Sequence, residues 1–266
     1  MKYLFTSFLI LFAVALFAQD TTEALETPNP VSLADTVDKE SPFILQTGAG
    51  LFSRYFWRGV KFGSGVSIQG YADLSLVNEN GNGAFGIGAF AAQNFMGSFL
   101  DFGNTMNLYL YYSQNIGDNS NVTFYLDDYF FYNEDNLYSA FDYSPENTLH
   151  FIETRIEATI GKWHGVAGYS IYQAESMKNT APYLELGYSI NDETRIFAGG
   201  VTGASDLNFM TNSGITNVGV TQSRNIYRLP CEFTFVCNPS YKKISEISLA
   251  RPATASAFTF IAAIAF

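Results

Sequence analysis

The sequence predicts an all-β protein: a transmembrane antiparallel up-and-down β-barrel of about 12 strands, with 10 or 14 as the alternatives. Three observations predict this class. Apolar and polar residues alternate along the chain, connections between candidate strands are alternately short and long, and the last segment has one apolar face. With 17% aromatic but only 15% charged residues, against about 25% charged in an average soluble domain, the composition fits a barrel in lipid.

The composition also excludes other classes of protein. Although 47% of the residues are hydrophobic, the mean hydropathy is only +0.04, so apolar residues are interleaved with polar ones. A helical membrane protein would instead need runs of roughly 20 apolar residues. The dense aromatic residues argue against disorder. A net charge of -11, with only 14 Lys and Arg, argues against nucleic acid as a partner.

Alternation with a period of two is clearest in three segments, 68–76, 150–160 and 182–188. In each, apolar side chains share one face and charged or polar side chains share the other. In a soluble sandwich the apolar face would point inward, whereas in an outer-membrane barrel it points to lipid and the polar face lines the interior. Alternation alone does not choose between these two folds.

The connection lengths favour the barrel. The twelve candidate strands are 44–55, 66–77, 84–94, 102–115, 121–132, 148–161, 163–174, 181–190, 194–203, 213–228, 231–238 and 256–266. Every second connection is short, and the others are generally longer. This asymmetry is expected when short turns face the periplasm and long loops face outside. With an even number of strands, both termini are then periplasmic.

The last ten residues, 257–266, strengthen the prediction. Their apolar face consists of Phe258, Phe260, Ala262, Ile264 and Phe266. An apolar face that ends on a C-terminal aromatic residue looks like the signal that the barrel assembly machinery recognises in a terminal strand. A closed barrel also pairs every backbone amide, as a bilayer requires. We therefore expect outer-membrane lipid and this machinery, during biogenesis, as partners.

The N-terminal residues read as an export signal and a leader. Residues 1–18 contain Lys2, an apolar core and small residues, as a secretory signal peptide does. Cleavage after Ala18 or after Ala15 is compatible with the sequence. Residues 19–42 hold six acids against one base and three prolines, which predicts an acidic disordered periplasmic leader. The barrel then comprises 43–266.

A family resemblance supports the same fold. The stretch Phe52-Ser53-Arg54-Tyr55-Phe56-Trp57-Arg58-Gly59, followed by Ile68-Gln69-Gly70, resembles the opening hairpin of the TorF-like family of outer-membrane porins. That family comprises β-barrels of Gram-negative bacteria without an assigned substrate. The resemblance implies a porin-like barrel in the outer membrane. It supplies no catalytic or ligand-binding residue.

Charged residues on the polar faces are the candidate lumen lining. By parity, Arg54 and Arg58 project to the same side of an extended first strand, and we expect them near the outer rim. The full set of predicted lumen or selectivity residues is Arg54, Arg58, Asp73, Glu153, Arg155, Glu157 and Glu185. Such a lining can select ions or solutes. Alternatively, these groups pair with one another and close the barrel.

Other chemistry-bearing residues give weak signals. A lipase-like site would need a histidine beside a serine, and His150 lies near Ser144 in the long loop 133–147, a pairing common by chance. Carboxylates in that loop lack the spacing of a calcium ladder. Cys231 and Cys237, six residues apart on a strand, are too distant to bridge and are predicted free. We expect no enzyme activity, no metal and no cofactor.

The leading functional hypothesis is a narrow passive channel for small solutes or ions. Because the lining carries a surplus of acids, a conducting barrel is expected to favour cations. The second hypothesis is a sealed structural or binding barrel that presents its outer loops to a partner. A membrane-embedded hydrolase or acyltransferase is the remote third. Small interior residues would favour the channel, and bulky interlocking lumen pairs would favour the sealed barrel.

Overall fold

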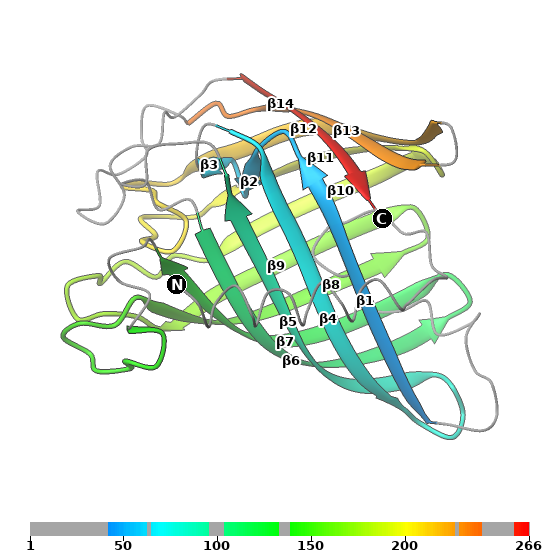
Figure 1. Ribbon diagram of the computed structural model, residues 1–266, viewed down its shortest axis with the longest axis horizontal. Helices are drawn as coiled ribbons and strands as arrows, with labels where there is room; N and C mark the ends of the chain where they lie inside the picture. The colour runs from blue at the N-terminus through cyan, green and yellow to red at the C-terminus, as the bar shows by residue number, and fades with distance from the viewer. Residues whose placement is uncertain are drawn as a thin grey trace.

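The computed structural model describes residues 42–62, 65–95, 104–132, 139–226, 229–240 and 258–265. Within these residues the chain is all-β, and twelve strands form one closed antiparallel barrel (Figure 1). Across the same residues, the structure has no helix with the length and apolar character needed to cross a membrane. The expected signal peptide 1–18, all but the last residue of the expected leader 19–42, and Phe266 lie outside the described residues.

The barrel strands follow one another around the wall in sequence order. They are β1 (Phe43–Phe52), β4 (Ser67–Val77), β5 (Gly83–Asn94), β6 (Asn104–Gly117), β7 (Ser120–Tyr132), β8 (His150–Ile160), β9 (Trp163–Tyr172), β10 (Tyr183–Asn191), β11 (Thr194–Val201), β12 (Gly214–Ile226), β13 (Leu229–Cys237) and β14 (Phe258–Ala265). The predicted twelve-stranded up-and-down barrel is therefore confirmed, and each predicted strand overlaps its observed counterpart.

The first strand, β1, closes the barrel by pairing with two neighbours, and the two pairings differ in length. β1 pairs with β4 over ten residues, from Phe43 opposite Leu76 to Phe52 opposite Ser67. With β14, β1 forms only three residue pairs, at Gly50–Phe52. Two further hydrogen bonds, between Ser53 and Ala262, extend this closing seam.

The two ends of the barrel are built from different connections. One end carries the short connections 78–82, 118–119, 161–162 and 192–193, and we call it the turn end. The opposite end carries the long connections and is called the loop end. β1 begins at the turn end, and β14 runs back toward it, as the sequence predicted from the alternation of short and long connections.

Side chains alternate along each strand, so that polar residues mostly face the lumen and apolar residues face the outer surface. On β6, Leu108 and Leu110 point outward and are 48% and 41% exposed, whereas Tyr109 and Tyr111 point inward and are 3% and 4% exposed. The other strands repeat the pattern, with exposed Phe and Leu outside and buried Asp, Ser, Thr and Glu inside. On β14, Phe258, Phe260 and Ile264 face outward.

One element was not predicted: a small hairpin inside the barrel. β2 (Tyr55–Trp57) and β3 (Val60–Phe62) pair with each other in a sheet of their own (Figure 1). The predicted strand 44–55 is therefore too long, because the wall strand ends at Phe52. Arg58 is not on that strand but at the turn of the hairpin. Aromatic residues recur on both sides of the bend at 53–54, and the sequence pattern therefore predicted one continuous strand there.

Candidate functional site

The hairpin crosses the lumen at its loop end and turns sharply at Arg58 and Gly59. Both residues have positive φ angles, 48° and 89°, as a two-residue hairpin turn of type I′ requires. A Cβ atom on Gly59 would lie 2.1 Å from the carbonyl oxygen of Thr216 on β12. Asn238 donates a hydrogen bond to the Gly59 carbonyl oxygen at 2.7 Å. The turn therefore packs against the barrel wall at β12 and against Asn238, which follows β13.

Arg58 forms a buried ion pair with Glu153 of β8. Its two terminal nitrogens donate to the two carboxylate oxygens at 2.8 and 2.7 Å, the bidentate geometry that a planar guanidinium favours. The two side chains are only 7% and 1% exposed. The guanidinium also lies between the rings of Trp57 and Tyr183, 4.5 and 4.4 Å from their centroids. The tip of the hairpin is therefore held by charge and by stacking together.

Aromatic packing fixes the rest of the hairpin. Phe62 stacks on Phe131 of β7 with centroids 5.5 Å apart and meets Phe209 edge-on at the same distance. Tyr55 lies 5.0 Å from Phe62 on the same hairpin, and Trp57 lies 5.2 Å from Tyr129. All of these residues except Trp57 are buried in one cluster. Such pairs stabilise beyond the area they bury.

A second ion cluster lies on the wall itself. Arg155 of β8 donates from Nε to Asp127 of β7 at 2.8 Å and from a terminal nitrogen at 3.1 Å. Its other terminal nitrogen contacts Glu157, and its guanidinium lies 3.8 Å from the ring centroid of Tyr125. All four residues are inward-facing members of β7 and β8. This cluster ties two adjacent strands, whereas the Arg58 pair ties the hairpin to the wall.

Asp73 of β4 lies in a group of tyrosines that adjoins this cluster, since the ring centroids of Tyr111 and Tyr125 are 5.7 Å apart. Tyr111 donates a hydrogen bond to its carboxylate at 2.8 Å. On β5, Gly86 and Gly88 leave the room that the rings of Tyr111 and Tyr109 fill, since a Cβ on either glycine would come within 2.3 Å of a ring atom. Small residues on one strand thus allow large polar residues on the next to enter the lumen.

Below the hairpin, the turn-end half of the barrel encloses a cavity of about 980 Å³. Phe56, Trp57 and Arg58 border it on the hairpin side, and the short connections around 118–119 and 192–193 border it at the turn end. We call this cavity the cup. Its lining is mixed, with charged, hydroxyl and aromatic side chains from most of the barrel strands.

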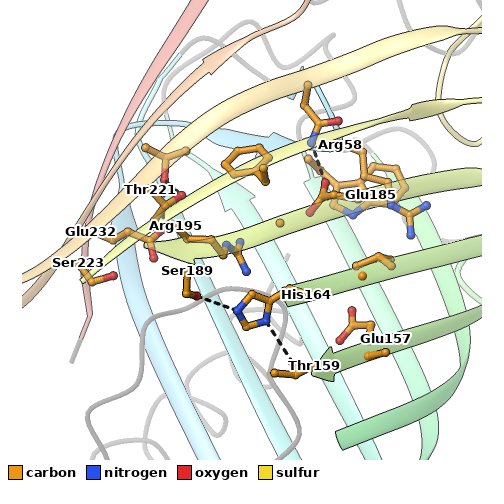
Figure 2. Close-up of a pocket in the computed structure, with 18 of the residues that line it drawn as sticks. Arg58, Glu157, Thr159, His164, Glu185, Ser189, Arg195, Thr221, Ser223 and Glu232 are labelled. Atoms are coloured by element: carbon orange, nitrogen blue, oxygen red, sulfur yellow. Dashed lines mark hydrogen bonds between the residues drawn. The ribbon is translucent and has the colours of Figure 1, made fainter. Parts of the chain in front are cut away.

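One wall of the cup carries a row of polar side chains (Figure 2). His164 of β9 lies between two hydroxyls: its Nε2 is 2.8 Å from Ser189 Oγ, and its Nδ1 is 3.2 Å from Thr159 Oγ1. Glu185 on β10 accepts hydrogen bonds from Asn217, at 2.7 Å, and from Tyr183. Sequence reasoning missed the contact between His164 and Ser189, because the two residues lie 25 positions apart and parity on single strands does not give the register between β9 and β10.

The seven predicted lumen residues all lie on the inner side of the barrel or its hairpin. Those that line the cup are Arg54, Arg58, Arg155, Glu157 and Glu185. Asp73 and Glu153 are buried inside, 4% and 1% exposed. Most of the set is engaged in pairs, but the Arg54 Nε atom has no hydrogen-bond partner among the described residues. The pairs join β7, β8 and the hairpin, which parity on single strands could not predict.

The histidine near the long loop does not meet a serine. His150 contacts Asp128 through Nδ1 at 2.7 Å and the Ala140 carbonyl oxygen through Nε2 at 3.2 Å. Ser144 instead donates to Asp142, at 2.6 Å from Oγ and 2.9 Å from its amide. These hydrogen bonds hold the pKa of Asp142 below its ordinary value. The Ser144 and His150 arrangement considered from the sequence is therefore not formed.

No group of three or more potential metal ligands occurs among the described residues. Cys231 and Cys237 are free thiols on β13.

The chain matches no protein-family model, and no curated protein shows significant similarity to it. The geometry of the hairpin and the cup therefore carries the functional argument.

Proposed function

We propose that this protein is an outer-membrane β-barrel of a Gram-negative bacterium that acts as a narrow passive channel for small solutes or ions. In the described conformation the hairpin β2–β3 closes the loop end. The proposal includes the membership of the TorF-like family of porins that the segment 52–59 suggests. Outer-membrane lipid surrounds the barrel, and the assembly machinery inserts it.

The outer surface supports the membrane location. Large apolar side chains on the outward faces of the strands are 40–60% exposed, among them Phe85, Ile87, Phe124 and Leu184. A soluble protein rarely exposes so large an apolar surface, whereas a bilayer requires it. The apolar outward face of β14 supports recognition by the assembly machinery.

The observation that carries the channel is that the hairpin is not part of the barrel wall. β1 pairs directly with β4 over ten residues, so the hairpin can leave the lumen without breaking a wall strand pair. Behind it lies the cup, a cavity of mixed lining that already extends to the turn end. Movement of the hairpin would therefore remove Tyr55, Trp57 and Phe62 from the cluster that fills the lumen between the cup and the loop end.

The test is single-channel conductance of the refolded protein in a planar bilayer under a salt gradient. The wild type is expected to be mostly silent. Glu153→Gln keeps the shape of the side chain but removes its charge and leaves Arg58 buried without a counterion, so discrete opening steps with cation preference are expected. Silence in both proteins, with normal folding, would contradict the channel.

The depth of the hairpin packing favours a second function, a sealed barrel that presents its loops to a partner. Tyr55, Phe62 and Phe209 are 3–6% exposed, like a protein core. In this case Glu153→Gln destabilises the hairpin but never conducts. Only excision of the hairpin would then produce current.

A further inference from the structure

The parts of the Arg58 site come mainly from the barrel, not from the hairpin. Glu153 belongs to β8, Tyr183 to β10, and Asn208 to the connection between β11 and β12. The Asn208 Oδ1 atom accepts from Arg58 at 3.4 Å. Of the groups that surround the guanidinium, only Trp57 moves with the hairpin. If the hairpin withdraws, a nearly complete cation site remains in the wall.

That site is shaped for a planar guanidinium. Two parallel hydrogen bonds of 2.8 and 2.7 Å use both oxygens of Glu153, and the Tyr183 ring covers one flat side of the cation at 4.4 Å. A guanidinium presents its donors in a rigid fork and stacks on aromatic rings, whereas an ammonium is a compact point charge. The site therefore discriminates between two cations of equal charge.

With the hairpin in place, an empty site would be strongly unfavourable, because Glu153 then stays buried. Glu153 is 1% exposed, and its other hydrogen bond, from Tyr129 Oη, is long at 3.5 Å. A buried carboxylate that loses its cationic partner is far more costly than an exposed one. With the hairpin in place, loss of the Arg58 guanidinium therefore favours the entry of another cation. Arg155 cannot supply it, because Arg155 already binds Asp127 on the wall.

We propose that Glu153, Tyr183 and Asn208 form a receptor site for the guanidinium group of a small solute, which Arg58 occupies in the closed state. A solute in the cup can reach this site, since Arg58 and Tyr183 line the cavity. By competing with Arg58, a guanidinium-bearing solute stabilises the withdrawn hairpin. This opening step rests on the proposed channel function, but the binding site does not.

The experiment is chemical rescue of Arg58→Ala, which removes the internal occupant. The melting temperature (Tm) of the refolded barrel is measured with ethylguanidinium or ethylammonium at equal millimolar concentrations. Ethylguanidinium is expected to restore about half of the lost Tm by binding the folded state, and ethylammonium to restore much less. The matched control is Arg224→Ala, whose partner Glu193 is 61% exposed, and it should show no rescue.

The double variant Arg58→Ala, Glu153→Gln decides whether the carboxylate is the receptor. Loss of rescue there supports the site. Equal rescue by both cations, rescue that persists in the double variant, or no rescue in Arg58→Ala would overturn it. If Arg58→Ala does not fold alone, the same comparisons are made on its refolding yield. Because Tm and yield do not depend on conduction, failure of this site is distinguishable from failure of the channel.

Discussion

The two halves of the lumen share one wall but differ in what fills them. In the loop-end half, Phe62 of the hairpin, Phe131 of the wall and Phe209 of the β11–β12 connection belong to one buried cluster, each at most 6% exposed. In the turn-end half, polar side chains such as His164 and Ser189 border a cavity of about 980 Å³. One half is packed like a protein core, and the other is hollow.

The inward face of β8 passes through both halves and shows what causes the difference. Phe151 and Glu153 lie beside the hairpin and are 4% and 1% exposed, whereas Glu157 and Thr159, further along the same face, line the cup. The pairing of β8 with β7 is regular across these positions. The hairpin, an insertion between two paired wall strands, fills one half together with connection residues such as Leu207 and Phe209, and the other half stays accessible.

The largest effect is expected from Phe62→Ala, which tests whether the loop-end half is a true core. Phe62 is 3% exposed and meets several aromatic rings, so its truncation should lower the free energy of unfolding by about 3–5 kcal/mol. Urea unfolding of the barrel in lipid vesicles measures this loss.

The control for Phe62 is Phe141→Ala in the connection between β7 and β8. Phe141 is 89% exposed, and its removal should change the free energy of unfolding by less than about 0.5 kcal/mol. Equal effects of the two substitutions would mean that the hairpin is not packed in the lumen, and the contrast between the two halves would disappear.

The wall was predictable from the sequence because its rules are local. Alternation along each strand set which side chains point inward, and short connections such as 161–162 and 192–193 marked the strand ends. The inward position of Asp73, Glu153 and Glu185 followed from parity once the connection lengths had favoured a barrel. No comparison between distant segments was needed for these features.

The hairpin was not predictable in the same way, because its partners are distant in sequence. Arg58 meets Glu153 across 95 positions and Asn208 across 150, and no local pattern encodes such contacts. A local signal did exist: Arg58-Gly59 is flanked by aromatic and β-branched residues, as in a two-residue hairpin. Arg58 was instead assigned to an extended first strand, and no hairpin was predicted.

In the hollow half, the counterpart of Phe62→Ala is Ser189→Ala. It removes the hydrogen bond between Ser189 and His164, 2.8 Å long and only partly buried. Because solvent in the cup can replace the lost partner, we expect the free energy of unfolding to fall by only about 0.5–1 kcal/mol. The same urea experiment measures it.

Ser223→Ala is the matched control, since Ser223 also lines the cup but makes no side-chain hydrogen bond among the described residues. Its substitution should have no measurable effect. A loss for Ser189→Ala as large as that for Phe62→Ala would show that the polar wall is as tightly determined as the aromatic cluster.

The smallest effect lies outside the lumen, in the loop at its closed end. The pKa of Asp142 is lowered by hydrogen bonds from Ser144. A carboxyl group whose folded-state pKa is depressed stabilises the fold above its unfolded pKa of about 4, and this stabilisation is lost as the pH falls through the folded value. The loop should therefore loosen below about pH 4, while the hairpin beneath it stays packed.

Pepsin, which is active in this acidic range and cuts next to aromatic residues, reports the loosening at Phe141. Asp142→Asn lacks the titrating carboxylate, so the ratio of its cleavage rate to that of the wild type cancels the pH dependence of the protease. We expect the ratio to exceed one near pH 4 and to approach one near pH 2, because the protonated wild type then resembles the variant. A ratio that stays constant would show that Asp142 does not secure the loop, and that the order at this end comes from the hairpin and the wall alone.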